Sequence, residues 1–311
     1  MNKLAFVFPG QGSQKVGMLF DLAKEYSVIA STFSEASEAL NYNLWDMVSS
    51  GPQALLNLTE HTQPILLTAS VAIYRAWREQ GGAVPVLMAG HSLGEWSALV
   101  CSEVVSFADA VKATERRGRY MQEAVPKGEG SMAAVIGLTD KDIIDVCQQA
   151  AQGQAVSAVN FNSPGQVVIA GNTAAVDRAC KLCKEKGAKR IMPLAVSAPF
   201  HSSLLKPAAE KLRGYLEGVN FNPPRTPIIH NVHAQTESDP SVIKQRMIEQ
   251  VDHPVLWTDC INALAKAGIN TLVECGPGKV LCGLAKRIDK SLTAMPVEAP
   301  VDFQMALAFD Y

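Results

Sequence analysis

The stretch "MAGHSLGEWSAL" (88–99) places one serine between two glycines, directly after an apolar run. Residues Gly90 to Gly94 fit the pattern G-x-S-x-G, in which a sharp strand-to-helix turn lifts the serine hydroxyl out of a sheet. Such a turn leaves only glycine-sized room on either side of the serine. An ordinary strand-to-helix turn is the alternative, so the pattern makes Ser92 a candidate nucleophile whose partners must be sought elsewhere in the chain.

Outside this turn, strand-like and helical patterns alternate along the chain. Short apolar runs occur at 4–8, 85–90, 226–232 and 270–276, and helical patterns separate them. This alternation is typical of a mostly parallel sheet that is covered by helices on both faces. We therefore predict an α/β fold with a mostly parallel sheet in its larger part.

Between residues 128 and 198 the rhythm changes. The segments "SMAAVIGL", "DKDIIDVCQQAA", "AVSAVNF", "GQVVIAG", "TAAVDRACKLCKEKG" and "KRIMPLAV" spell strand, helix, strand, strand, helix, strand. This order is typical of a ferredoxin-like split βαβ unit. Because the earlier patterns resume after residue 200, we predict a small domain, 128–198, inserted into a large domain formed by 1–127 and 199–311. A cleft between the two domains is the natural place for a ligand.

Composition narrows the class of protein. The chain has 311 residues, 48% of them hydrophobic and 19% charged, with a formal net charge of −2. This balance is typical of a soluble globular protein and gives no reason to expect a nucleic-acid partner. The apolar runs are too short for a membrane span or a signal-peptide core. We expect a cytoplasmic protein without a membrane partner.

The cysteines and paired histidines do not form a convincing metal or redox site. Seven cysteines are scattered along the chain, which favours free thiols in a reducing compartment. Cys180-x-x-Cys183 lies in a helical pattern, where ordinary helix packing is the simpler interpretation. His230-x-x-His233 has no second pair at ligand spacing. We therefore predict no metal.

A serine nucleophile needs a base, normally a histidine within hydrogen-bond reach. His91 is adjacent in sequence, but neighbouring side chains diverge on a sharp turn. His201 is the better candidate, because "VSAPFHSSLL" places it where the chain leaves the small domain. A loop histidine can also be a surface or packing residue, and the spacing does not identify a third group that would orient the base.

The oxyanion of an acyl-transfer intermediate needs hydrogen-bond donors, and backbone N–H groups usually supply them. In a turn of this type the amide that follows the nucleophile, that of Leu93, is one such donor. The amide of Gln11, in the glycine-rich loop "FPGQGSQKVG" (8–17), is the candidate for the second. The same loop also has part of a dinucleotide-binding pattern, but Lys15 stands where that pattern requires glycine.

The helical pattern at 107–125 contains an arginine on its apolar side. Most of its charged residues share one face by 3.6-residue spacing, whereas Arg117 lies on the opposite stripe among alanines and Met121. A cation that leaves water there must find a partner. An internal Asp or Glu is one possibility. A ligand carboxylate is the other, because the planar guanidinium can hold it with two hydrogen bonds.

Taken together, the segments "FPGQGSQ", "GHSLGE", the helix of Arg117, "NSPGQVVIAG" and "APFH" resemble the successive motifs of the malonyl-CoA:acyl carrier protein transacylase family. The resemblance spans nearly the whole chain, and five motifs in order are far more specific than G-x-S-x-G alone. It implies an α/β-hydrolase-like large domain with a ferredoxin-like insertion.

The resemblance also implies roles for the candidate residues. Ser92 would be the acylated nucleophile and His201 its base. The amides of Gln11 and Leu93 would form the oxyanion hole, and Arg117 would bind the malonyl carboxylate.

Other positions follow from the same resemblance. In this family a main-chain carbonyl near a glutamine orients the histidine, and Gln250 in "MIEQVDHPV" fits that place. Phe200 is similar to the residue that accompanies malonyl preference. Met121, Asn160 and Asn162 would be further substrate contacts in the pocket.

The implied reaction is a ping-pong transfer of malonyl from malonyl-CoA to the phosphopantetheine thiol of acyl carrier protein, for fatty acid biosynthesis. Its partners would be malonyl-CoA, coenzyme A and acyl carrier protein. No cofactor is expected, and we expect a monomer. Lys189, Lys286 and Arg287 are basic candidates for docking the acidic carrier.

Two other classes of protein stay open at this point. A plain serine hydrolase would need no buried Arg117 and would usually have an acidic triad member and a late histidine. A nucleotide-binding module would need glycine at position 15 and would not use Ser92 or His201. The tail "MPVEAPVDFQMALAFDY" matches no motif.

Overall fold

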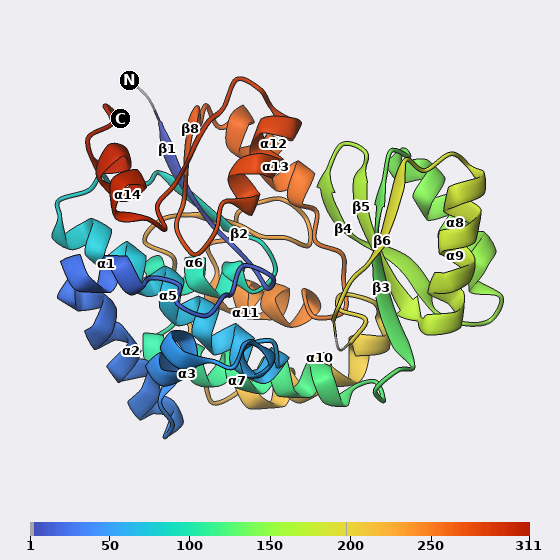
Figure 1. Ribbon diagram of the computed structural model, residues 1–311, viewed down its shortest axis with the longest axis horizontal. Helices are drawn as coiled ribbons and strands as arrows, with labels where there is room; N and C mark the ends of the chain where they lie inside the picture. Colours follow the sequence, from blue (N-terminus) through green and yellow to red (C-terminus); the bar gives the residue numbers. More distant parts are fainter. Residues whose placement is uncertain (1–2, 197) are drawn as a thin grey trace.

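The computed structural model describes residues 3–196 and 198–311, which form two lobes with one sheet each (Figure 1). The large lobe contains a five-stranded sheet in the order β7-β2-β1-β8-β9. Every neighbouring pair in it is parallel. Its strands are β1 (Leu4–Phe8), β2 (Leu87–Gly90), β7 (Ile228–Ile229), β8 (Thr271–Glu274) and β9 (Thr293–Pro296). The predicted α/β class with a mostly parallel sheet is confirmed.

Side chains of the central strand β1 alternate between two hydrophobic cores. Phe6 and Phe8 point into the larger core, which is built chiefly by the helices that precede residue 124. Ala5 and Val7 point into a smaller core on the opposite face, against α12 (Trp257–Lys266) and α13 (Val280–Ile288). Burial on both faces explains why these strands are apolar throughout, as expected of a parallel sheet.

The remaining helices of the large lobe surround the larger core. They are α1 (Phe20–Glu25), α2 (Ser27–Leu40), α3 (Leu44–Ser50), α4 (Gln53–Leu56), α5 (Thr59–Glu79), α6 (Gly94–Cys101), α7 (Phe107–Glu123), the 3-10 turn η1 (Ser203–Leu205), α10 (Lys206–Leu216), α11 (Pro240–Glu249) and α14 (Pro300–Leu307). The last helix, α14, is held by Phe303, whose buried ring packs against Tyr26 and Trp77.

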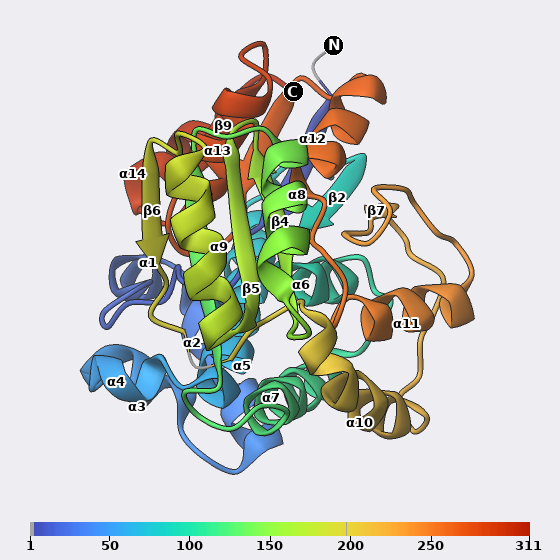
Figure 2. The same cartoon turned by 90° about the vertical axis from the view of Figure 1, so that its right-hand side faces the viewer.

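The small lobe is a four-stranded antiparallel sheet in the order β4-β5-β3-β6. Its strands are β3 (Gly130–Ile136), β4 (Val156–Ser163), β5 (Gln166–Asn172) and β6 (Arg190–Pro193). Helices α8 (Asp140–Ala151) and α9 (Thr173–Glu185) lie side by side across one face (Figure 2). All six elements follow the predicted order of strand, helix, strand, strand, helix, strand.

The two faces of the small sheet have different partners. Ala133 and Val135 pack beneath α8 and α9, whereas Met132 and Ala134 belong to the core of the large lobe. Strand β4 is also joined to the large lobe through Val255, whose N–H donates to Val159 O (2.8 Å) and whose carbonyl accepts from Phe161 N (3.0 Å). The small lobe is therefore fixed over the large one by main-chain hydrogen bonds as well as by packing.

Two differences from the sequence prediction concern the large lobe. The segment at 226–232 contributes only the two-residue strand β7, because Pro227 precedes it and the chain then turns. The tail without a motif completes the edge strand β9 with its first two residues and forms α14, which covers the core. Among the residues described, no helix is long and apolar enough to cross a membrane.

Candidate active site

The turn between β2 and α6 presents Ser92 in a strained backbone conformation. Its φ of 50° lies in the left-handed region, which side chains other than glycine rarely adopt. A Cβ atom at Gly90 would lie 1.9 Å from the carbonyl carbon of Gly94, and one at Gly94 would lie 2.0 Å from Phe8 O. Glycine is therefore required at both positions, and the strand-to-helix turn at Ser92 has the close approaches that the G-x-S-x-G pattern predicts.

A buried asparagine holds this turn from behind. Asn231 Oδ1 accepts a hydrogen bond from the N–H of Ser92 (2.8 Å), and its Nδ2 donates to Gly90 O (2.7 Å). The two bonds fix the serine backbone and the end of β2 on one side chain. Sequence reasoning gave no role to Asn231, which lies inside the His230-x-x-His233 pair and 139 residues from Ser92.

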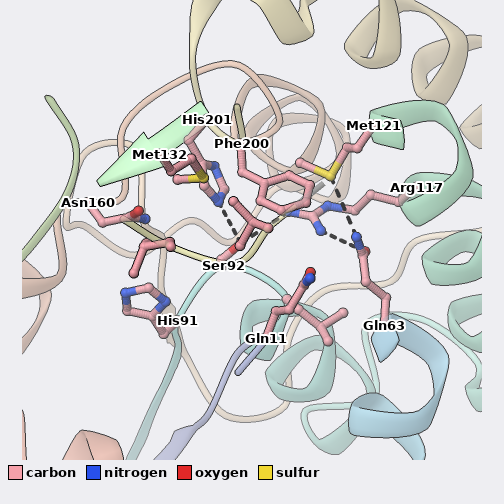
Figure 3. Close-up of a pocket in the computed structure, with 13 residues that line it drawn as sticks. Gln11, Gln63, His91, Ser92, Arg117, Met121, Met132, Asn160, Phe200 and His201 are labelled. Carbon is pink, nitrogen blue, oxygen red and sulfur yellow. Dashed lines mark hydrogen bonds between the residues drawn. The ribbon is translucent and has the colours of Figure 1, made fainter. Parts of the chain in front are cut away.

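His201 meets the serine hydroxyl. Its Nδ1–H donates to the main-chain carbonyl of Gln250 (2.7 Å), so Nε2 is left to accept from the Ser92 hydroxyl (2.7 Å; Figure 3). Burial, with a further contribution from the nearby Arg117 cation, lowers the pKa of His201 to about 3. A neutral imidazole with a free lone pair toward the hydroxyl is the form that can act as a base.

Arg117 lies beside the same hydroxyl and is 2% exposed. Its Nη1 donates to Gln63 Oε1 (2.7 Å) and its Nη2 to Gln250 Oε1 (2.8 Å), while Nη2 is also 3.3 Å from Ser92 Oγ. Burial lowers the pKa of Arg117 to about 10, and the negative charge of Glu95 opposes that lowering. The guanidinium therefore keeps its charge at neutral pH.

The partners of Arg117 decide between the two interpretations of its burial. Both close partners are neutral amides. Within the described residues, 3–196 and 198–311, no carboxylate forms an ion pair with Arg117. Its Nε is buried without a partner among the same residues. The internal Asp or Glu considered from the sequence is not in contact with it, so the cation has capacity left for an anionic ligand.

These groups line one cavity of about 110 Å³ between the lobes. Eight residues predicted from the sequence are in its wall: Gln11, Ser92, Leu93, Arg117, Met121, Asn160, Phe200 and His201. Five others were not predicted: Gln63, His91, Met132, Leu194 and Val196. Met132 comes from β3 and Asn160 from β4, so both lobes contribute to the wall.

Two predicted site residues lie outside the cavity wall. Gln250 sits behind it, where its carbonyl accepts from His201 and its side chain contacts Arg117. Asn162 Oδ1 instead accepts from His91 Nε2 (2.8 Å). This bond turns the His91 ring away from Ser92, in line with the expectation that His91 is a poor base.

The main-chain N–H groups proposed for the oxyanion hole have no competing acceptor. Neither the amide of Gln11 nor that of Leu93 donates to any atom of the described chain, and both residues line the cavity. The Gln11 side chain is held aside by Thr59 Oγ1, which accepts from its Nε2 (3.2 Å). Across residues 3–196 and 198–311, no group of three or more His, Cys, Asp or Glu side chains is placed to hold a metal ion.

Comparisons with known proteins agree with this geometry. The family model described as "Acyl transferase domain" matches residues 5–301. The malonyl CoA-acyl carrier protein transacylase of Escherichia coli (strain K12) is 54% identical over 307 residues, which cover 99% of both chains.

Solved structures give the same result. The crystal structure of an acyl carrier protein S-malonyltransferase from Vibrio cholerae O1 aligns with a TM-score of 0.96 at 54% identity, covering 97% of this chain and 99% of that one. A malonyl-transacylase in complex with a type II PKS acyl-carrier protein aligns with a TM-score of 0.97 at 51% identity, covering 98% and 99%. The chain belongs to the acyl transferase family, within the group of malonyl CoA-acyl carrier protein transacylases.

Proposed function

We propose that this protein transfers a malonyl group from malonyl-CoA to the phosphopantetheine thiol of acyl carrier protein through a malonyl-Ser92 intermediate. The observation that carries the proposal is the pairing of an activated serine with a buried cation that has no ion-pair partner in the described chain. Only 3.3 Å separates Arg117 Nη2 from Ser92 Oγ. A carboxylate bound there must be a few bonds from the acyl carbon, as it is in malonyl.

In the first half-reaction His201 acts as the general base. Its Nε2 takes the hydroxyl proton while Ser92 Oγ attacks the thioester carbonyl, forming the C–O bond. The amides of Gln11 and Leu93 donate to the resulting oxyanion. When the C–S bond breaks, the proton on Nε2 goes to the departing thiolate of coenzyme A, and malonyl-Ser92 remains.

The second half-reaction runs the same steps in reverse. The carrier thiol gives its proton to His201 Nε2 as its sulfur attacks the malonyl ester. When the C–O bond breaks, Ser92 Oγ recovers the proton. Because the carbonyl of Gln250 accepts from Nδ1, it holds one tautomer through both halves and stabilises the transient imidazolium. A main-chain carbonyl thus takes the place that an acidic residue has in most serine hydrolases.

Arg117 accounts for the choice of acyl group. A malonyl carboxylate would complete the hydrogen bonding of the guanidinium, whereas an acetyl group would leave the buried cation without an anion. Phe200, which is buried at the cavity wall, would limit the room for a branched acyl group. Met121 and Asn160 would complete the wall around the substrate, while Asn162 would act indirectly by holding His91.

We also propose a finer description of the two lobes. The large lobe is α/β-hydrolase-like and consists of 1–127 and 199–311, and the small lobe, 128–198, is a ferredoxin-like insertion. The parallel sheet with a nucleophile turn after β2 supports the first part, and the strand order β4-β5-β3-β6 supports the second.

Partners and location follow from the chemistry. Besides malonyl-CoA and coenzyme A, the partner is acyl carrier protein, and Lys189, Lys286 and Arg287 are all exposed for docking it. Arg287 also donates to Gln166 Oε1 (2.6 Å), so this basic region spans both lobes. We propose a monomer in the cytoplasm, a location that the seven free cysteines support.

Intact-protein mass spectrometry after brief exposure to malonyl-CoA tests the function. We expect a malonyl adduct on the wild type, its absence from Ser92→Ala, and its discharge on addition of the phosphopantetheine-loaded carrier, with malonyl appearing on the carrier. Steady release of free coenzyme A and malonate without a transferable adduct would instead indicate a thioesterase and overturn the proposal.

A further inference from the structure

A buried carboxylate lies behind the active site without touching the cavity. Glu95, in the first turn of α6, is 1% exposed. Its Oε1 accepts from His230 Nδ1 (2.6 Å), and its Oε2 accepts from Gln250 Nε2 (2.6 Å) and from the N–H of Asn231 (3.2 Å). Burial of a carboxylate is costly unless its oxygens are hydrogen-bonded. The mechanism above does not use Glu95, so its position needs a separate explanation.

The side-chain amide of Gln250 connects Glu95 to Arg117. Its Nε2 donates to Glu95 Oε2 and also to Ser92 O (2.9 Å), while its Oε1 accepts from Arg117 Nη2 (2.8 Å). A carboxylate and a carbonyl can only accept, and a guanidinium can only donate. The chemistry of these partners therefore fixes the orientation of the amide. Turned by 180°, the amide would point its own N–H groups at the guanidinium and push Arg117 away.

His230 fixes the carboxylate itself. It is fully buried, and its Nδ1–H occupies Oε1 of Glu95, so that Oε2 is left for Gln250. Its Nε2 has no hydrogen-bond partner among the described residues. One oxygen of Glu95 therefore remains for the Gln250 amide that faces Arg117.

We propose that Glu95 is a positioning residue for substrate selection: it holds the Gln250 amide in the one orientation that fixes the Arg117 guanidinium for a ligand carboxylate. The inference rests on the proposed role of Arg117 in binding malonyl. Glu95 contacts neither the serine hydroxyl nor the cavity, and it acts through Gln250. Its effect should therefore appear in the choice between acyl groups rather than in the chemistry at Ser92.

The first test is Glu95→Gln, which keeps the size of the side chain but removes its charge. The new amide can also rotate by 180°, so that its oxygen and nitrogen exchange places. Losing a charge-assisted hydrogen bond predicts a fall in kcat/KM for malonyl-CoA of about tenfold, mostly in KM, because the carboxylate contact exists in both the ground state and the transition state. Transfer of acetyl, which has no carboxylate, should change by less than about twofold. Glu103→Gln, at an exposed position that pairs with Arg225, is the matched control and should leave the transfer of both acyl groups unchanged.

A double-mutant cycle with Arg117→Ala decides whether Glu95 acts through Arg117. In the Arg117→Ala background, Glu95→Gln should cause no further loss of malonyl transfer. An equal loss in both backgrounds, an equal loss for malonyl and acetyl, or a rise in the malonyl-to-acetyl ratio would overturn the inference.

The outcomes also separate this inference from the proposal on which it rests. If Arg117→Ala alone leaves the malonyl-to-acetyl ratio unchanged, the role of Arg117 fails and the inference falls with it. If the ratio drops but the cycle is additive, only the role of Glu95 fails. Circular dichroism checks that each variant is folded. Should Glu95→Gln not fold, Glu95→Asp, which retracts the carboxylate by one methylene, goes through the same cycle with the same expected outcomes.

Discussion

His201 and Arg117 lie at two ends of one cavity, and burial lowers the pKa of both, with different consequences for their charge. Burial lowers the pKa of His201 from 6.5 to about 3 and that of Arg117 to about 10. The histidine therefore stays neutral well below pH 6.5 and keeps a lone pair toward the hydroxyl. The arginine starts so high that it stays charged. Loss of solvent can thus keep one group neutral and leave another charged within one small pocket, according to the ordinary pKa of each group.

The partners of the two residues differ in a matching way. His201 is held by a main-chain carbonyl, which accepts one hydrogen bond and selects one tautomer. Arg117 is held by the side-chain amides of Gln63 and Gln250, which position the guanidinium without neutralising it. In the proposed mechanism, the hydrogen bonds of His201 are complete before substrate arrives, whereas those of Arg117 would be completed by a bound anion.

Removing the base should have the largest effect. His201→Ala takes away the group that accepts the hydroxyl proton, so kcat for malonyl transfer should fall by a factor on the order of 10⁴ or more. Malonyl and acetyl transfer should fall by similar factors, since both use the same base. Stopped-flow or quenched measurement of Ser92 acylation provides the rates. A loss confined to malonyl would mean that His201 belongs to recognition rather than to chemistry.

Removing the Arg117 cation should change the preference for malonyl over acetyl far more than the rate of acyl transfer itself. Arg117→Ala should reduce kcat/KM for malonyl-CoA on the order of 10²-fold and leave acetyl transfer nearly unchanged, because only malonyl carries the carboxylate. Arg116→Ala, on the exposed face of the same helix, is the matched control and should alter neither substrate. Steady-state kinetics with both thioesters measures the ratio, and an unchanged ratio would separate Arg117 from recognition.

The pH dependence should expose the neutral base. An ordinary histidine is mostly protonated at pH 5, but with a pKa of about 3 His201 stays neutral there. We expect kcat/KM, which reports the free enzyme, to be largely retained from pH 7 to pH 5. A profile of kcat/KM against pH in a constant-ionic-strength buffer tests this. An acid limb near pH 6.5 would show that burial does not lower the pKa of His201.

The same shift predicts a slope in stability. Between about pH 3 and pH 6.5 the unfolded chain binds a proton at position 201 that the folded protein does not bind, so stability due to this group falls as the pH drops through that range. Thermal unfolding of the wild type and of His201→Ala from pH 7 to pH 4 compares the two slopes. The variant should lose less stability on acidification, and parallel slopes would contradict the shift.

The smallest effect is expected from a charge reversal on the proposed docking surface, away from the cavity. Lys286→Glu reverses a charge on the exposed face of α13 and should raise KM for the carrier by roughly threefold at low salt, an effect that salt removes. Acylation by malonyl-CoA should not change. Lys112→Glu, exposed on α7, makes the same change in net charge away from α13 (Figure 1) and is the control. Equal effects of both variants would show that only net charge matters and would remove Lys286 from the docking surface.

Residues with a local signal could be predicted from the sequence. The two glycines around Ser92 indicate the turn because no other residue fits there, and helical spacing alone places Arg117 on a buried face. The alternation of strands and helices likewise predicts both lobes. In each case the information lies within a few residues along the chain, which is why periodicity and spacing detect it.

Which distant groups meet these residues depends on the tertiary structure. Gln63 and Asn231 belong to no functional motif, and Glu95 ends the segment "GHSLGE" without a role that the sequence indicates. All three join the site through contacts that span 54 to 155 residues along the chain. The tail closes the fold through β9 and Phe303, again without a local motif. The nucleophile turn, the two lobes and the buried cation follow from the sequence alone, because short-range sterics and hydrophobic spacing dictate them. The lowered pKa of His201, the absence of a contacting carboxylate at Arg117 among the described residues and the fixed amide of Gln250 depend on burial and on partners that only folding brings together.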